Sequence, residues 1–175
     1  LTLELATLLN LRGQHREALA LISKRNFHPW EGGEGKVAAQ YTLALSELAR
    51  AALHAGLANV ALDYLQQALD WPQSLGEGKL VGHQDNPIHL LRGLALHQLG
   101  RDADANGAFE LASIGISDLS ATHFYNDQPA ETIYSQGLAL RQLKREEEAQ
   151  SRFQLLYQYG EQELDQKQTI DYFAV

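Results

Sequence analysis

Apolar residues recur every three or four positions in a series of short stretches along the chain. Within one such stretch the apolar positions are Leu91, Ala95, Leu96 and Leu99. This spacing is typical of one face of an α-helix. Gly100 follows at once, where a helix commonly ends, and a second periodic stretch begins soon after it. The pattern therefore predicts two helices joined by a short turn.

This unit repeats. The segment "GLALHQLGRDADANGAFEL" (93–111) returns as "GLALRQLKREEEAQSRFQL" (137–155), 44 residues later, and fainter copies lie at 5–22 and 48–69. The residues at the predicted turns are Gly13, Gly56, Gly100 and Lys144. Each first helix carries a small residue: Ala6, Ala49, Gly93 and Gly137. Each second helix carries an early alanine and then a larger apolar residue: Ala18 with Ile22, Ala61 with Leu65, Ala105 with Phe109, and Ala149 with Phe153.

We therefore expect an all-α fold made of four antiparallel helical hairpins in one helical-repeat domain over residues 1–175. The repeats cover about 1–34, 37–74, 87–117 and 131–160, and a further helix starts at 165–175. Ala105, Phe109, Ala149 and Phe153 should pack at the centre. Long connections at about 24–36, 70–86 and 114–130 should emerge on one edge, because all of them join one hairpin to the next.

These features resemble the tetratricopeptide repeat, an α-α superhelix or solenoid. Its standard repeat is about 34 residues, and here the surplus lies in the long loops. The resemblance implies that the first helices line a concave groove, with candidate binding residues Asn10, Arg50, His97, Tyr134 and Arg141. Chaperone-type members hold a C-terminal carboxylate with lysine and asparagine on the first helix. Leu3 and Thr7 stand there instead, which excludes that partner class.

The loops carry the most distinctive residues. "GEGK" occurs at 33–36 and again at 76–79, but neither copy has the strand, spacing and following Ser or Thr of a phosphate-binding loop. The candidate binding edge comprises His28, Trp30, Glu31, Glu34, Lys36, Trp71, Glu77, Lys79, His83, Asp85, Tyr125, Asn126 and Asp127. A structural interpretation assigns the glycines to tight turns, the glutamates to helix N-termini and the lysines to ion pairs. A functional interpretation notes that aromatic and acidic side chains together suit a sugar.

Four strings support a closer resemblance: "FHPWEGGEGKV" (27–37), "SLGEGKL" (74–80), "YNDQPAETIYSQGLAL" (125–140) and "IDYFAV" (170–175). They resemble large bacterial proteins that have a β-rich, carbohydrate-enzyme-like N-terminal domain of unknown function followed by tetratricopeptide-like repeats. The resemblance implies that this chain is the helical region of such a protein and a fragment of a longer chain. It implies no catalytic residue.

Composition and charge disfavour several classes of binding partner. The net charge of −8 is not offset by a basic stripe, which disfavours nucleic acid. No apolar run approaches the ~20 residues that span a bilayer, so we expect no membrane insertion. There is no cysteine, which excludes thiolate chemistry and disulfides. The scattered histidines form no metal-binding pattern, and we expect no cofactor. We expect a cytoplasmic protein, although these features do not fix the compartment.

Two hypotheses for function follow. In the first, the chain is an interaction module without catalysis of its own, which binds the rest of its own chain or another protein. In the second, it is a carbohydrate-active component whose loop edge contributes to a sugar-binding or glycosidase site formed with a β-rich domain. The direction in which the loop carboxylates point should separate them. Convergence on an open cleft favours the sugar, and local caps or ion pairs favour the interaction module.

Overall fold

The computed structural model describes residues 1–115 and 131–165, and all regular structure in these ranges is helical. The α-helices are α1 (Thr2–Leu11), α2 (His15–Ser23), α3 (Lys36–His54), α4 (Ala58–Leu69), α5 (Asn86–Gln98), α6 (Asp102–Ser113), α7 (Glu131–Gln142) and α8 (Glu146–Asp165). A single turn of 3₁₀-helix, η1 (Gln73–Leu75), lies between α4 and α5. The all-α prediction is confirmed for this part of the chain. The further helix predicted at 165–175 lies almost wholly outside the described residues.

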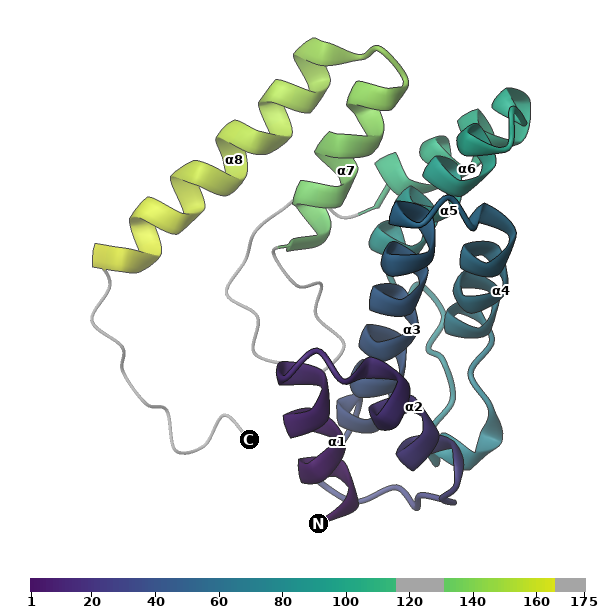
Figure 1. Cartoon of the computed structure of the whole chain (residues 1–175). Helices are drawn as coiled ribbons and strands as arrows, with labels where there is room; N and C mark the ends of the chain where they lie inside the picture. The colour runs from purple at the N-terminus through teal and green to yellow at the C-terminus, as the bar shows by residue number, and fades with distance from the viewer. Residues whose placement is uncertain (116–130, 166–175) are drawn as a thin grey trace.

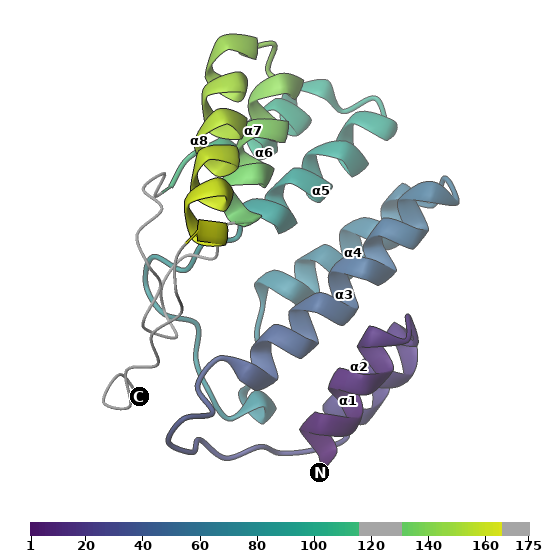
Figure 2. The ribbon, with the colours of Figure 1, turned by 90° about the vertical axis from the view of Figure 1, so that its left-hand side faces the viewer.

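The helices pair in chain order. α1 packs on α2, α3 on α4, α5 on α6, and α7 on α8. The second helix of each hairpin also contacts the first helix of the next, and successive first helices contact one another. Figure 2 shows the result, with the hairpins following one another from α1 and α2 at the bottom to α7 and α8 at the top. The main interfaces between the described hairpins therefore join hairpins that are neighbours in sequence.

All four hairpin turns have the same backbone geometry. The turn residues Gly13, Gly56, Gly100 and Lys144 have φ of 72°, 75°, 71° and 61°. The residue after each turn donates its N–H to a carbonyl five positions earlier: Gln14 to Leu9, Leu57 to Ala52, Arg101 to Leu96, and Arg145 to Leu140, at 2.8–2.9 Å. This is the Schellman arrangement, which satisfies the last carbonyls of a helix. Lys144 is the one non-glycine residue of the described chain with a positive φ, so the fourth turn is built in spite of a side chain.

The two helices of a hairpin approach closely at the small residues of the repeat. A Cβ atom on Gly93 would lie 2.3 Å from Cε1 of Phe109, and one on Gly137 would lie 2.4 Å from Cε1 of Phe153. No real Cβ atom tolerates such a distance, so the aromatic ring occupies the space that glycine leaves. In the first two hairpins the small residue is alanine, and the large residue is Ile22 or Leu65, both fully buried. A glycine thus accompanies an aromatic partner, and an alanine accompanies an aliphatic one.

The core forms two clusters along the stack. One joins the first two hairpins to α5, and the other joins α5 and α6 to α7. Ala105, Phe109 and Ala149 are buried as predicted, with Phe109 at 3% exposure. Phe153 is only half-buried, which corrects its predicted place at the centre. It belongs to the last described hairpin, so no later hairpin in these residues covers it, and its ring contacts Tyr134 and Arg141 instead.

The close approach at Gly93 gives a test with a matched control. Gly93→Ala should destabilise the fold, because the new methyl group meets the Phe109 ring. Phe109→Ala should cost about 3–5 kcal/mol, as for other buried aromatic residues. The double variant should lose less stability than the sum of the two single variants, because removing the ring also removes its clash with the new methyl group. Gly107→Ala is the control: no atom lies within 4 Å of that position, so it should stabilise α6 by about 0.5–1 kcal/mol. Urea unfolding measures all four, and an additive pair would show that the two residues do not meet.

The fourth turn offers a second test. Lys144→Gly should stabilise the fold by about 1 kcal/mol, since a left-handed conformation costs a side chain roughly that much. Gly100→Lys at the equivalent turn should lower the free energy of unfolding by a similar amount. Thermal unfolding of both variants measures the difference, and equal stabilities would mean that Lys144 is not held in the left-handed region.

Candidate functional site

The first two inter-hairpin loops meet at one edge of the stack. The backbone N–H of Phe27 donates to the carbonyl of Ser74 over 2.8 Å. Gly76 lies so close that a Cβ atom there would be 2.6 Å from the Phe27 carbonyl oxygen, and its φ of +80° also favours glycine. The loops at 24–35 and 70–85 are therefore one layer. The third predicted loop, with Tyr125, Asn126 and Asp127, falls in residues 116–130, outside the described part of the chain.

Glu77 joins this layer to α3. Its Oε2 accepts the N–H of Gly35 at 2.6 Å and its Oε1 accepts the N–H of Ala38 at 3.1 Å. Both donors lie at the start of α3, where backbone N–H groups have no partner within the helix. The carboxylate also lies at the positive end of the helix dipole. Glu77 thus caps α3, the first helix of the second hairpin, and fastens the second loop to that hairpin.

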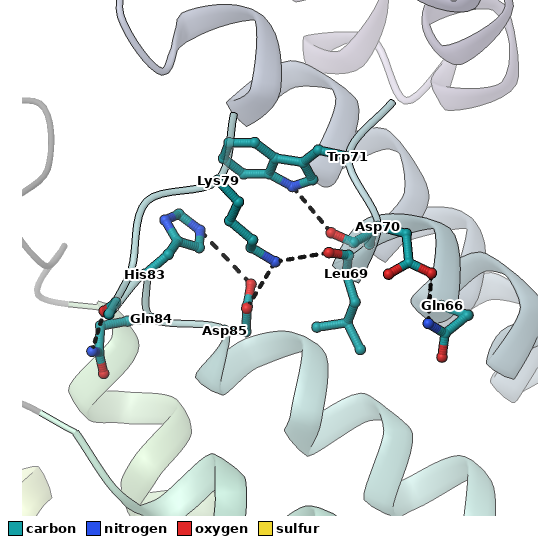
Figure 3. A network of polar contacts seen from close by, with 10 residues as sticks. Gln66, Leu69, Asp70, Trp71, Lys79, His83, Gln84 and Asp85 are labelled. Atoms are coloured by element: carbon teal, nitrogen blue, oxygen red, sulfur yellow. Dashed lines mark hydrogen bonds and ion pairs between the residues drawn. The ribbon is translucent and has the colours of Figure 1, made fainter. Parts of the chain in front are cut away.

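Lys79 performs a matching role between α4 and α5, as Figure 3 shows. Its Nζ donates to the Leu69 carbonyl at the end of α4 over 3.2 Å and pairs with Oδ2 of Asp85, just before α5, at 2.8 Å. The ammonium also lies 5.3 Å from the centre of the Trp71 ring. One side chain therefore binds the negative end of one helix and a carboxylate at the positive end of the next.

Aromatic groups enclose this lysine. The Trp71 indole donates to the Ala68 carbonyl over 3.2 Å and packs against the larger core cluster. The His83 ring meets the Trp71 ring edge-on at 5.1 Å. Partial burial lowers the pKa of His83 below its usual 6.5, and the nearby Asp85 carboxylate opposes that shift. The lowered pKa favours the neutral form of the His83 ring, whose Nε2 lies 3.7 Å from Asp85 Oδ1.

The remaining loop residues do not form a deep site. The Trp30 ring lies on Gly33, where a Cβ atom would be only 1.8 Å from the indole. His28, Trp30, Glu34 and Glu77 help to line a hollow of about 60 Å³. Glu31, Glu34 and Lys36 are exposed, and Lys36 donates to the Gly32 carbonyl. Small-molecule pockets usually hold roughly 300–1,000 Å³, so this hollow is too small for a sugar ring.

The two "GEGK" strings are not structural equivalents, although they keep the repeat spacing. In the first, Lys36 is the first residue of α3. The second lies in mid-loop, and α5 starts only at Asn86. The second string makes the caps that the structural interpretation predicted, but Glu77 caps α3 and not the helix that follows it. In the first string, the side chain of Glu34 is exposed and forms no hydrogen bond or ion pair with the described residues.

Three of the five groove candidates bridge their own hairpin turns. Asn10 Oδ1 contacts His15 Nδ1 at 3.0 Å, His97 Nδ1 contacts Asp102 at 2.7 Å, and Arg141 Nε donates to Glu146 at 3.2 Å. Each pair is five residues apart and recurs at the repeat spacing. Asn10 is also only 4% exposed, because its amide donates to Gln40 on α3, so it is not an open groove residue. Arg50 pairs with Glu47, and Tyr134 is half exposed against Phe153.

A larger hollow lies elsewhere, between α4 and α6 with α5 as its floor. It encloses about 620 Å³. Its apolar wall comprises Leu62, Leu96, Ala108 and Leu111, and its polar wall comprises Asp63, Gln66, Arg92, Arg101 and Asp104. Arg101 pairs with Asp104 at 2.7 Å, whereas Arg92 is half-buried and has neither an ion pair nor a hydrogen bond among the described residues. The hollow, which we call the α4–α6 groove, therefore offers leucines beside an uncommitted cation.

Sequence reasoning named no candidate site on these second helices and missed the groove. A signal was present in the repeat itself. The position of Arg92 is occupied by Leu5, Leu48 and Gln136 in the other first helices, so the charge is a local departure. Gly107 corresponds to Asp63 and Ser151, and its missing side chain opens the α6 wall.

Sequence reasoning also missed Asn86. It is 2% exposed, and its amide donates to the carbonyls of Ala112 and Ile114, at 2.8 and 2.6 Å. It thereby fastens the start of α5 to the end of α6. The adjacent Pro87 marks a helix start, but no local pattern names a partner 26 residues away.

Residues 1–115 and 131–165 contain no cluster of three or more histidine, aspartate or glutamate side chains placed to hold a metal ion. None of the helices in these ranges is both long and apolar enough to cross a bilayer. No protein-family model matches the chain, and no solved structure is significantly similar to it. Its function must therefore be argued from the geometry described above.

The helix cap that Glu77 forms on α3 can be tested directly. Glu77→Ala should destabilise the fold by about 1–2 kcal/mol, the usual loss when a helix cap is removed. Glu34→Ala is the matched control from the other "GEGK" string, and it should change stability by less than about 0.5 kcal/mol because the side chain is exposed. Equal effects in chemical unfolding would contradict the assignment of the cap to Glu77.

Proposed function

We propose that this chain is a tetratricopeptide-like interaction module, whose hairpins form a superhelical solenoid that binds a segment of another protein or of a longer parent chain. The observation that carries the proposal is the repeated helical hairpin. All four copies share one turn geometry, and in each a large side chain of the second helix corresponds to a small residue of the first. Such arrays expose long, regular surfaces while each unit contacts only its neighbours. Repeat modules of this kind serve mainly as binding scaffolds. The resemblance to the helical region of large bacterial proteins agrees with this role.

The α4–α6 groove is the binding face that we favour. Its volume is within the range of ligand pockets, and it combines apolar walls with one uncommitted guanidinium. An extended peptide would place an apolar side chain against Leu62, Leu96 and Leu111 and an acidic side chain on Arg92. Arginine suits this role because its planar fork binds a carboxylate through two hydrogen bonds. Asp63 and Asp104 at the rim would disfavour peptides with several acidic residues.

The loop edge supports a structural role better than a sugar site. Glu77 and Asp85 are engaged by backbone N–H groups and by Lys79, and Trp71 packs against the core. Glu34 and Glu77 both line the hollow beside Trp30, but this hollow holds only about 60 Å³, and Glu31 is not part of its lining. By the criterion of where the carboxylates point, these contacts favour the interaction module.

A peptide-display selection tests the groove. The purified 175-residue chain should enrich peptides that combine one acidic and one large apolar residue. Arg92→Glu should weaken their binding by about tenfold or more, as expected when a charge-assisted contact is lost. Gly107→Leu should also weaken it, because the leucine fills the groove from a position with open space around it. Trp30→Ala on the loop edge is the control and should bind as wild type.

Two outcomes would overturn this assignment. The first is a selection that enriches no peptide. The second is a set of peptides that the groove variants bind normally and Trp30→Ala does not, which would return the binding face to the loop edge. Circular dichroism of each variant checks that the helices are intact.

A further inference from the structure

The polar wall of the α4–α6 groove holds two charged groups that the described chain leaves unpaired. Arg101 holds Oδ2 of Asp104 with its Nε at 2.9 Å and with a terminal nitrogen at 2.7 Å. Gln66 donates to a carboxylate one turn further along α4 over 2.7 Å. The Arg92 guanidinium and the Asp63 carboxylate line the same hollow, and neither forms a hydrogen bond or an ion pair with the described residues. The groove therefore offers a partner one cation and one anion.

The two unpaired groups lie at different depths and at nearly the same level of the groove. Arg92 is half-buried on the α5 floor, and Asp63 is exposed on the α4 wall. Because Gly93 meets the Phe109 ring, Arg92 lies level with the second half of α6. Asp63 is the repeat equivalent of Gly107, in the same helix of the next hairpin. The two charges are therefore within about one helical turn of each other along the groove.

An occupant that pairs with both groups must carry an acid and a base close together. An extended chain rises about 3.3 Å per residue, so the two side chains would lie within about three residues of each other. The acid would reach down to the Arg92 guanidinium, and the base would stay near the rim beside Asp63. An occupant with the acid alone would instead meet Asp63 as a like charge, which disfavours binding.

The charge of the whole molecule also favours a base in the partner. The chain carries a net charge of −8, so its field opposes a segment that is only acidic and attracts one that brings a positive group. Within the groove, the guanidiniums of Arg92 and Arg101 balance the carboxylates of Asp63 and Asp104. The groove therefore has no excess positive charge that would offset the field of the rest of the chain.

We infer that the α4–α6 groove binds a peptide segment with paired charges. The segment carries an acidic residue for Arg92, a basic residue for Asp63 within about three positions of it, and a large apolar residue against Leu96 and Leu111. The inference rests on the proposed function and narrows it, from peptides with an acidic and an apolar residue to peptides that also carry a base. The apolar contact supplies burial, and the two charges fix the orientation and select the partner.

A display selection with four peptide libraries tests the paired charges. The libraries share their apolar positions and differ at two nearby positions, which hold Glu and Lys, Glu and Gln, Gln and Lys, or Gln at both. Mixed in equal amounts over the purified 175-residue chain, the Glu–Lys library should be enriched several-fold over the Glu-only library. Equal or greater enrichment of the Glu-only library would overturn this inference and leave the proposed function standing. Enrichment of no library, or of the Lys-only library above the rest, would overturn both.

The sign of the effect of Asp63→Asn separates a binding role of this carboxylate from simple screening of Arg92. If Asp63 pairs with the base, the variant should bind a selected Glu–Lys peptide about threefold more weakly, a typical loss for a solvent-exposed ion pair. The analogue with Gln in place of Lys should not be weakened, and the difference between the two peptides isolates the contact. Glu17→Gln removes the same charge from an exposed position on α2 and should leave binding unchanged. Fluorescence anisotropy measures each pair, and unchanged or tighter binding of the Glu–Lys peptide to Asp63→Asn would overturn the inference.

Discussion

The close contact between a large side chain on the second helix of a hairpin and a small residue on the first sets the geometry of that hairpin. Where the large residue is Phe109 or Phe153, the small one is glycine, and the ring lies where a Cβ atom would be. This contact fixes how near the two axes come, and the shared turn fixes where the second helix begins. The interfaces between hairpins then repeat, because each hairpin presents its neighbour with the same spacing.

The helices and their pairing could be predicted from sequence because the signals are local. A period of three to four, a turn residue at fixed spacing and an alanine early in the second helix all lie within one repeat. Even the fourth turn was found through its register, although Lys144 replaces glycine there. The exposure of Phe153 could not be read in this way. The repeat pattern treats every copy alike, whereas burial depends on whether another hairpin follows.

The loop edge shows the opposite case, in which an identical string has two structural roles. Nothing in the letters "GEGK" shows that the first copy ends at a helix start while the second remains in a loop. The difference arises because α3 begins about two turns earlier within its repeat than α5 does. Glu77 can cap α3 only because the second loop folds back on the first. Such a contact depends on the stacking of hairpins, so it is visible only in the assembled chain. The same holds for Asn86, which binds carbonyls of the helix that follows.

Departures from the repeat, more than the repeat itself, mark the surfaces that are open to partners. The groove exists where Gly107 replaces a larger residue and Arg92 replaces an apolar or neutral one. There the architecture has provided a helix-lined surface and has not filled it from within the described chain. The polar residues that recur near the turns, such as His97 and Arg141, are instead paired inside their own hairpins. In a stack of similar units, a residue that breaks the pattern and has no internal partner is thus a better guide to binding than an unusual loop, because its uncompensated charge or apolar area is what a partner can relieve.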